Sequence, residues 1–417
     1  MIEQYARRAG LHAAVCDAAA WADARARALT YAAQEANAYR VVEAFMAQGL
    51  SESDLAGTTG YGYDDPARDA YESLLCRLFG TERALARLSL VSGTHAIVAT
   101  LAACVPPGRT LLSATGAPYD TLQNAIVTAP HALVRQGIGY VEVPLAADGF
   151  DEVAVLDALR GDPSIGAMFV QRSRGYAPRA SMTVAQCERL FTMTKTVRPD
   201  VTIVVDDCYG ELVETREPTH VGADVAVGSL IKNLGGSIAP AGAYLAGTME
   251  IVERVAERHF APGLGASLGP TLGFGRAFLQ GLFHAPQVVA ECLRGLDFAA
   301  ALFERLGFDA SPACGDPRTD IVQAIRLGTE RRLLAFAGGL QASMPVNARF
   351  RPTPGNVPGY AEPVVMSSGA FVAGATIELS CDAPLRAPFE VYLQGGVSRV
   401  HAMIGAVHAA HAVLAAG

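Results

Sequence analysis

The stretch VTIVVDDCYGE, residues 201–211, places an unbroken apolar run directly before two carboxylates. A strand without polar alternation is typical of one buried on both faces, as in a parallel sheet. Amphipathic helical segments alternate with this run and with four others: RTLLSA (109–114), YVEVPL (140–145), AMFVQ (167–171) and DVAVGS (224–229). This alternation predicts βαβ units, and hence an α/β fold built on a largely parallel sheet.

The chain of 417 residues is too long for one small core, and its pattern predicts three parts. Residues 1–50 are expected to form a helical segment, residues 51–294 a large α/β domain, and residues 295–417 a smaller C-terminal α+β domain. Helical patterning is also expected from about residue 71 to 105, with an interruption at residues 91–94. Two uncharged stretches, 234–249 and 260–275, are interpreted as buried loops that glycine and proline make too short for a membrane span.

Composition narrows the class of protein. A formal net charge of −8 argues against nucleic acid, because phosphate binding needs a basic face. The eight cysteines form no C-x-x-C pair and indicate reduced thiols in a cytoplasmic protein. The N-terminal MIEQYARRAG lacks the apolar core of a signal peptide. The nine histidines show no metal-ligand spacing, so no metal site is expected.

Two short segments could bind a charged ligand. VSGTHA (91–96) places Ser92, Gly93 and Thr94 ahead of a helical run, where exposed amides and hydroxyls suit a phosphate. Its simpler interpretation is a helix cap. Asp206 follows a predicted buried strand and should therefore lie at the carboxyl edge of the sheet, where α/β proteins bind ligands. The alternative for Asp206 is an ordinary turn residue.

The segment VGSLIKNLGG (227–236) holds a lysine among apolar residues, with Ser229 three positions before Lys232. Lysine is rare in such surroundings, although a surface turn is the alternative. Burial would lower the pKa of Lys232 and allow its amine to form an imine with an aldehyde. An imine-forming lysine, an Asp for a pyridinium nitrogen and a phosphate cradle together predict pyridoxal phosphate as the cofactor.

Many motifs in order resemble the aluminium-resistance, or methionine γ-lyase-like, family of fold type I pyridoxal-phosphate enzymes. They are GTTGYGYDDPARD, SGTHAI, TGAPYDTL, QRSRGY, DDCYGE, GSLIKN, LQGLFHAP, PGY, IELSCDAPLR and YLQGG. The resemblance implies a large domain with a mixed, mostly parallel sheet, a smaller C-terminal domain, and a homotetramer built from tight dimers.

The resemblance also implies roles for individual residues. Lys232 would be the Schiff-base lysine, Asp206 the partner of the pyridine nitrogen, and Tyr119 the aromatic residue stacked on the ring. The phosphate would be held by Ser92, Gly93, Thr94 and Ser229. The loop with Tyr61 and Tyr63 would reach into a neighbouring subunit's site. Arg386 is the first choice for the substrate carboxylate, with Arg172 and Arg174 as alternatives.

The sequence departs from the family pattern at six positions, several of which are expected to flank the pocket: Asp207, Leu234, Ser237, Met344, Ser367 and Ser368. The predicted function is a carbon–heteroatom lyase acting on a small amino acid, with γ-elimination favoured over β-elimination. Tyr61, Tyr63 or Tyr119 would protonate a thiolate leaving group. One open alternative is loss of halide from a γ-chloro-γ,δ-unsaturated amino acid to give propargylglycine, and another is cleavage of methionine or cystathionine. An aminotransferase, an aldolase and a non-enzymatic metal-tolerance protein are the remaining alternatives.

Overall fold

The computed structural model describes residues 1–146, 149–357 and 360–417. A seven-stranded sheet forms its larger part, in the order β1-β9-β8-β7-β6-β2-β3. Its strands are β1 (Arg83–Arg87), β2 (Thr110–Ser113), β3 (Gly139–Glu142), β6 (Ile165–Gln171), β7 (Thr202–Asp206), β8 (Val225–Ser229) and β9 (Ala243–Gly247). The strands from β8 to β3 pair in parallel, whereas β9 and β1 add antiparallel. The predicted α/β fold with a mixed, mostly parallel sheet is confirmed.

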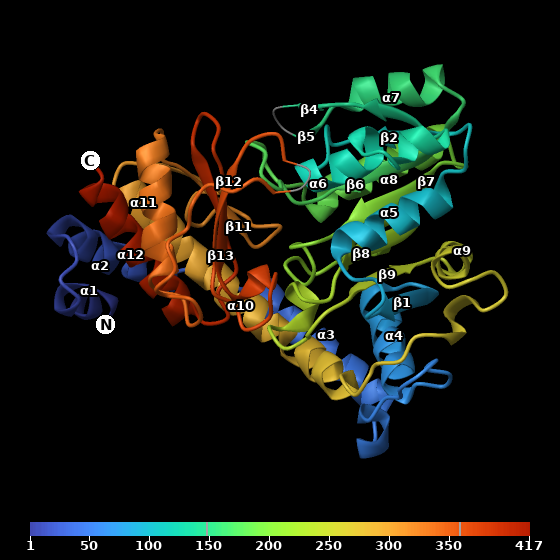
Figure 1. The fold of residues 1–417 in the computed structure, drawn as a ribbon, viewed down its shortest axis with the longest axis horizontal. Coiled ribbons are helices and arrows are strands. Elements are labelled where there is room, and N and C mark those ends of the chain that lie inside the picture. The colour runs from blue at the N-terminus through green and yellow to red at the C-terminus, as the bar shows by residue number, and fades with distance from the viewer. Residues whose placement is uncertain (147–148, 358–359) are drawn as a thin grey trace.

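Both faces of this sheet are buried, which explains the unbroken apolar runs. In β7, Val204 packs into one hydrophobic cluster, whereas Ile203 and Val205 pack into another on the opposite face. Helices cover the two faces (Figure 1): α5 (Gly93–Cys104) and α9 (Met249–His259) on one, α7 (Glu152–Gly161) and α8 (Val184–Val197) on the other.

Two expectations about secondary structure are wrong at the antiparallel edge. The helical pattern expected from residue 71 to 105 divides into α4 (Pro66–Phe79), strand β1 and helix α5. The stretch 234–249, expected as a buried loop, contains β9. The β1 sequence, RALAR, consists of strong helix formers, and the β9 sequence, AYLAG, has no β-branched residue, so neither sequence favours a strand.

The C-terminal part contains a five-stranded antiparallel sheet in the order β10-β11-β14-β13-β12. The strands are β10 (Asp309–Ser311), β11 (Val322–Arg326), β12 (Val364–Ser368), β13 (Ser380–Pro384) and β14 (Glu390–Gln394). Helices α11 (Glu330–Gln341) and α12 (Arg399–Ala415) pack beside it. Smaller elements are α6 (Asp120–Gln123) and the pair β4 (Leu145–Ala146) and β5 (Gly149–Phe150).

Helix α10 (Gly275–Arg305) joins the two sheets and has Pro286 in its interior. It runs through the predicted domain boundary between residues 294 and 295, so division of the chain at that point stays a prediction. The N-terminal helices α1 (Ile2–Arg8), α2 (Ala13–Arg27) and α3 (Ala32–Gln48) lie at the same end of the molecule as α12 or along α10 (Figure 1).

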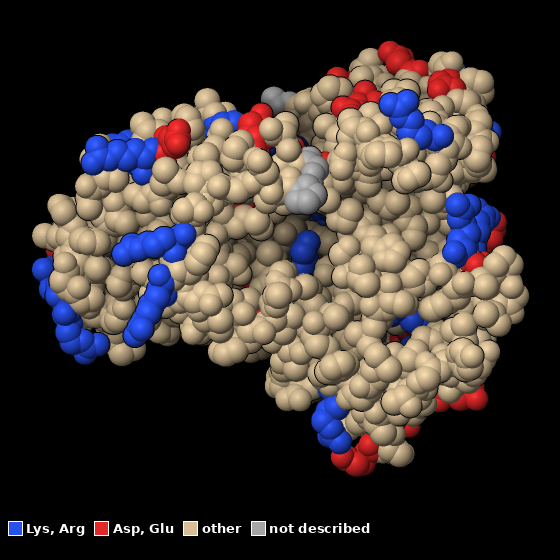
Figure 2. All heavy atoms as spheres, viewed as in Figure 1, with Lys and Arg blue, Asp and Glu red and all other residues tan. Residues whose placement is uncertain are grey.

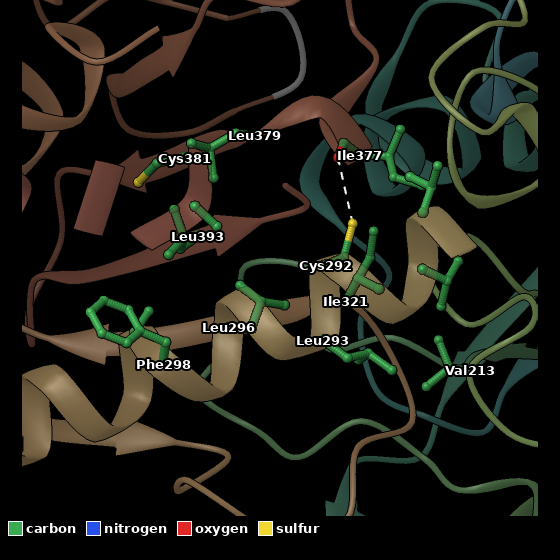
Figure 3. Packing of buried hydrophobic residues seen from close by; sticks show 14 of the residues in the cluster. Val213, Cys292, Leu293, Leu296, Phe298, Ile321, Ile377, Leu379, Cys381 and Leu393 are labelled. Atoms are coloured by element: carbon green, nitrogen blue, oxygen red, sulfur yellow. Dashed lines mark hydrogen bonds between the residues drawn. The ribbon is translucent and has the colours of Figure 1, made fainter. Parts of the chain in front are cut away.

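The core around α10 is apolar and continuous with the C-terminal sheet. Figure 3 shows α10 packed by Cys292, which bonds to the carbonyl oxygen of Ile377, and by Leu293, which points toward Val213. Each such fully buried side chain contributes about 1.5–3 kcal/mol relative to exposure. The long helix is therefore fixed to both sheets. In the described part of the chain, no helix combines the length and the apolar character that crossing a bilayer would need.

Candidate active site

Three strands of the large sheet end in polar residues at one edge. Gln171 ends β6, Asp206 ends β7 and Ser229 ends β8, and Gln171 pairs with Asp206 in register. A cavity of about 390 Å³ opens at this edge. The face in Figure 2 is hollowed between the lobe of the large sheet and the C-terminal lobe, and most of the surrounding surface is uncharged.

The cavity collects residues from distant parts of the sequence. Seven of the predicted site residues line it: Ser92, Gly93, Thr94, Tyr119, Asp206, Ser229 and Lys232. Its other walls come from Val91, Thr121, Gln171, Ser173, Gly175, Tyr176, Cys208, Tyr209, Ile231, Tyr360, Ala373 and Gly374. One wall therefore carries charged and hydroxyl groups, and another is aromatic.

Lys232 follows β8 and its Nζ lies 4.0 Å from the centre of the Tyr209 ring. Burial opposes the charge on the amine, but the neighbouring Cys208, Tyr209 and Asp206 outweigh it and raise the pKa of Lys232 well above its ordinary value. The expected lowering of this pKa is wrong, because the sequence does not reveal how many acidic groups surround the amine.

Gly235 and Gly236, in the loop that follows Lys232 (the lysine loop, residues 232–236), allow its backbone to pack against the backbone of α10. A Cβ on Gly236 would lie 2.3 Å from the carbonyl oxygen of Gly281 in α10, and a Cβ on Gly281 would lie 2.3 Å from that of Gly235. Any side chain at these positions would force the two segments apart. The lysine loop is thus seated directly on α10.

Asp206 is only 4% exposed. Its Oδ1 accepts a hydrogen bond from the backbone N–H of Cys208 at 3.1 Å. Burial raises the pKa of Asp206, while the charge of Lys232 opposes the rise. The carboxylate is therefore oriented by a backbone donor and feels the charge of the lysine.

The turn Ser92-Gly93-Thr94 caps a helix, as its simpler interpretation expected, and the phosphate role stays a prediction. Ser92 is the N-cap of α5, and its Oγ accepts a hydrogen bond from the backbone N–H of His95 at 3.1 Å. The same turn lines the cavity. A Cβ on Gly93 would lie 3.3 Å from the Cys208 Sγ, so a side chain there would require the thiol to shift by a few tenths of an ångström.

Tyr119 connects this turn with strand β6. Its phenol oxygen lies 2.6 Å from the Thr94 hydroxyl, and its backbone N–H donates to Oε1 of Gln171 at 2.8 Å. Burial and the charge of Asp206 raise the pKa of Tyr119 well above its ordinary value. The phenol therefore keeps its proton at neutral pH and can donate it.

Tyr61 and Tyr63 lie outside the cavity of the single chain. They are 77% and 52% exposed, and their ring centres lie 6.2 Å apart. A Cβ on Gly62 would lie 2.2 Å from the backbone N of Pro270, which shows how tightly their loop is packed. Their role in a neighbouring site stays a prediction.

None of the three predicted arginines lines the cavity. Arg172 is fully buried and bonds Asp207 at 2.7 Å and Glu214 at 2.8 Å. Arg174 donates to the carbonyl and hydroxyl oxygens of Ser311. Arg386 contacts the backbone of a cavity residue: its Nη2 donates to the carbonyl oxygen of Tyr176 at 2.9 Å. Which arginine binds a carboxylate stays a prediction.

The aromatic wall was missed in the assignment of site residues. Tyr176 and Tyr360 have ring centres 5.8 Å apart, and the Tyr176 hydroxyl donates to Asp382 at 2.8 Å. Tyr209 adopts a left-handed backbone with φ +74°, which costs on the order of 1–2 kcal/mol for a non-glycine residue. The motifs QRSRGY, DDCYGE and PGY contain these tyrosines; Pro358 and Gly359 of PGY lie outside the described residues. Strained backbone of this kind clusters at functional sites.

These groups fit pyridoxal phosphate. The cavity holds an amine for an aldehyde, a buried carboxylate for a ring nitrogen, and a capped helix start with hydroxyls for a phosphate. Lys232 and Asp206 would hold the aldehyde and the ring nitrogen. Ser92, Gly93, Thr94 and Ser229 would hold the phosphate.

Comparison with known proteins points the same way. The sequence profile of the methionine γ-lyase family matches residues 18–414. A carbon–sulfur lyase involved in aluminium resistance from Clostridium novyi NT is 36% identical, with a TM-score of 0.92 over 98% of each chain. A candidate cystathionine β-lyase involved in aluminium resistance from Clostridium acetobutylicum is 38% identical, with a TM-score of 0.93 over 98% of this chain and 97% of that one.

A curated relative, the uncharacterized protein YnbB of Bacillus subtilis (strain 168), is 39% identical over 372 residues, or 88% of each chain. Likeness in fold alone extends to cystathionine γ-synthase from Xanthomonas oryzae pv. oryzae, with a TM-score of 0.63, 15% identity, and coverage of 90% of this chain and 98% of that one. The fold is therefore that of fold type I pyridoxal-phosphate enzymes. Matched along nearly its whole length, the chain belongs to the methionine γ-lyase family.

Proposed function

We propose that the protein is a pyridoxal-phosphate-dependent carbon–sulfur lyase that releases a thiol from a small sulfur-containing amino acid. The observation that carries this proposal is the meeting of Lys232, Asp206 and Tyr119 in one cavity with the start of α5. The description of the Clostridium novyi relative as a carbon–sulfur lyase supports the same reaction class.

When bound, pyridoxal phosphate supplies an aldehyde for the substrate amine and a ring that accepts the electron pair left at Cα. Asp206 would hold a proton on the ring nitrogen, because its carboxylate is fixed by the Cys208 N–H. The Lys232 amine would take the Cα proton. The Tyr119 phenol, which keeps its proton at neutral pH, would donate that proton to the departing sulfur.

Both β- and γ-elimination fit these roles, and the products separate them. β-Elimination gives pyruvate with the thiol and ammonia, whereas γ-elimination gives 2-oxobutyrate. Loss of halide to form propargylglycine would need no acid at the leaving group. The Tyr119 phenol in the cavity favours a sulfur leaving group over a halide.

Site sharing between subunits is part of the proposal. The exposed aromatic pair Tyr61 and Tyr63 lies on a tightly packed loop outside its own cavity. We propose that this loop contributes to the site of a second copy in a homo-oligomer built from dimers.

The test uses the purified full-length chain with pyridoxal phosphate, beside Lys232→Ala. L-Cystathionine, L-methionine and L-cysteine are supplied in turn, and thiol, pyruvate and 2-oxobutyrate are measured. Lys232-dependent cofactor absorbance with thiol release from one substrate supports the lyase. Amino-group exchange with an added keto acid, aldehyde release, or no cofactor binding at all would contradict it.

A further inference from the structure

Lysine is almost absent from this chain. Lys195 and Lys232 are the only two lysines among 33 lysines and arginines. Lys195 lies at the opposite, amino edge of the sheet, where β7 and β8 begin. Its Nζ bonds there to Asp224 at 2.7 Å and to the carbonyl oxygen of Val201. Lys232 instead lies with its Nζ 4.0 Å above the centre of the Tyr209 ring. A cation over the face of an aromatic ring is attracted by the ring's quadrupole.

Tyr209 is held in place for this contact. Its carbonyl oxygen accepts a hydrogen bond from the Asn233 side chain at 3.0 Å and another from the Ile321 N–H at 3.1 Å. Asn233 follows the lysine directly, and Ile321 precedes strand β11 of the C-terminal sheet. The bonds from both sides fix the residue in its left-handed backbone conformation, φ +74°.

We propose that Tyr209 is a positioning residue that holds the Lys232 amine, in its charged form, against the face of its ring. The proposal rests on the proposed function, since it assigns Tyr209 a part in readying the amine for an aldehyde. The ring attracts the ammonium form and so opposes release of its proton. Tyr209 therefore limits how much neutral amine is present at a given pH.

Other titratable groups surround the amine. They are Asp206, Cys208, Tyr119, Glu211 and Asp382. All five remain in a variant that changes only residue 209. A comparison of two such variants therefore isolates the ring. Tyr209→Phe keeps the aromatic face, Tyr209→Leu removes it, and both place a non-glycine side chain on the same strained backbone.

The experiment is ¹³C NMR of the full-length, cofactor-free chain with lysine labelled at Cε, titrated with alkali. Only two lysine signals arise, and Lys195→Arg assigns them. In Tyr209→Phe, the Lys232 signal should titrate at the same pH as in wild type. In Tyr209→Leu it should titrate about one pH unit lower, which is about a tenfold loss of proton affinity. The Lys195 signal should not move.

Two outcomes would overturn the proposal: an unshifted Lys232 signal in Tyr209→Leu, or an equal shift in both variants. A wild-type chain that binds no pyridoxal phosphate would refute the proposed function instead. The NMR titration would still decide the role of Tyr209, because it does not use the cofactor.

Discussion

The hydroxyl oxygens of Thr94 and Tyr119 lie 2.6 Å apart and so join the first turn of α5 to the residue before α6. This contact orients the phenol inside the cavity. It also connects Thr94, in the predicted phosphate site, with Tyr119, the predicted proton donor. Separate variants of Thr94 and Tyr119 are therefore needed to distinguish the two roles.

Tyr119→Phe tests the proton donor. The ring remains but the acid is lost, so thiol release should fall about 10²-fold or more while cofactor affinity stays close to wild type. Thr94→Val is the matched control, because it removes the hydroxyl partner and leaves the phenol. β-Chloroalanine, whose chloride leaves without a proton, should be processed nearly normally by Tyr119→Phe; an equal loss with both substrates would show that Tyr119 is not the acid.

Arg172 and Arg386 should respond in opposite ways to replacement by methionine. Arg172→Met leaves the fully buried Asp207 without its cation, and should lower the free energy of unfolding by about 3–5 kcal/mol. Arg386 is partly exposed, so Arg386→Met should leave the free energy of unfolding nearly unchanged. If Arg386 binds the substrate carboxylate, its loss raises KM at least tenfold; denaturant unfolding and kinetics give both results, and an unchanged KM would assign the carboxylate to another group.

Glu217→Gln should flatten the dependence of stability on pH. Burial, together with the nearby Asp207, raises the pKa of Glu217 from 4.5 to about 8. The folded chain therefore keeps a proton that the unfolded chain has released. Its stabilising contribution is complete below pH 4.5 and is lost as the pH rises through about 8.

Glutamine mimics the protonated form at every pH. Relative to wild type, the variant should thus gain at least about 1 kcal/mol between pH 5 and pH 8. Thermal or urea unfolding at the two pH values measures this gain. Glu188→Gln, at a half-buried surface ion pair with Arg216, is the control, and parallel pH curves for Glu217→Gln and wild type would refute the expectation.

Complementation tests whether subunits share sites. Lys232→Ala and the double variant Tyr61→Ala, Tyr63→Ala should each be inactive alone. Unfolded and refolded together, they should recover about a quarter of wild-type activity, because half of the dimers are mixed and each holds one intact site. Recovery would fail if the tyrosines serve their own subunit, and the double tyrosine variant would be active alone if they do not serve catalysis.

The sequence was sufficient to predict the charged wall of the cavity. Asp206 and Ser229 end neighbouring strands, and parallel strands bring their carboxyl ends to one edge. Lys232 comes three residues after Ser229, so its position near the same edge could be inferred from the same pattern. Local periodicity and strand direction thus placed these groups.

The aromatic wall could not be predicted in this way. Tyr176, Tyr209 and Tyr360 come together only because the C-terminal sheet docks on the large one, through contacts such as Tyr176 with Asp382. Docking depends on long-range packing that leaves no periodic signal. The strained φ of Tyr209 likewise arises from bonds to Asn233 and Ile321 rather than from its own residue type.

The seat of the lysine loop on α10 limits how the amine can move. Because Gly235 and Gly281 touch backbone to backbone, the loop cannot swing without displacing the longest helix of the described chain. The amine must then travel by rotation about the four torsions of its own side chain. Because the Lys232 backbone is fixed, the amine can move only a few ångströms and stays within the same cavity.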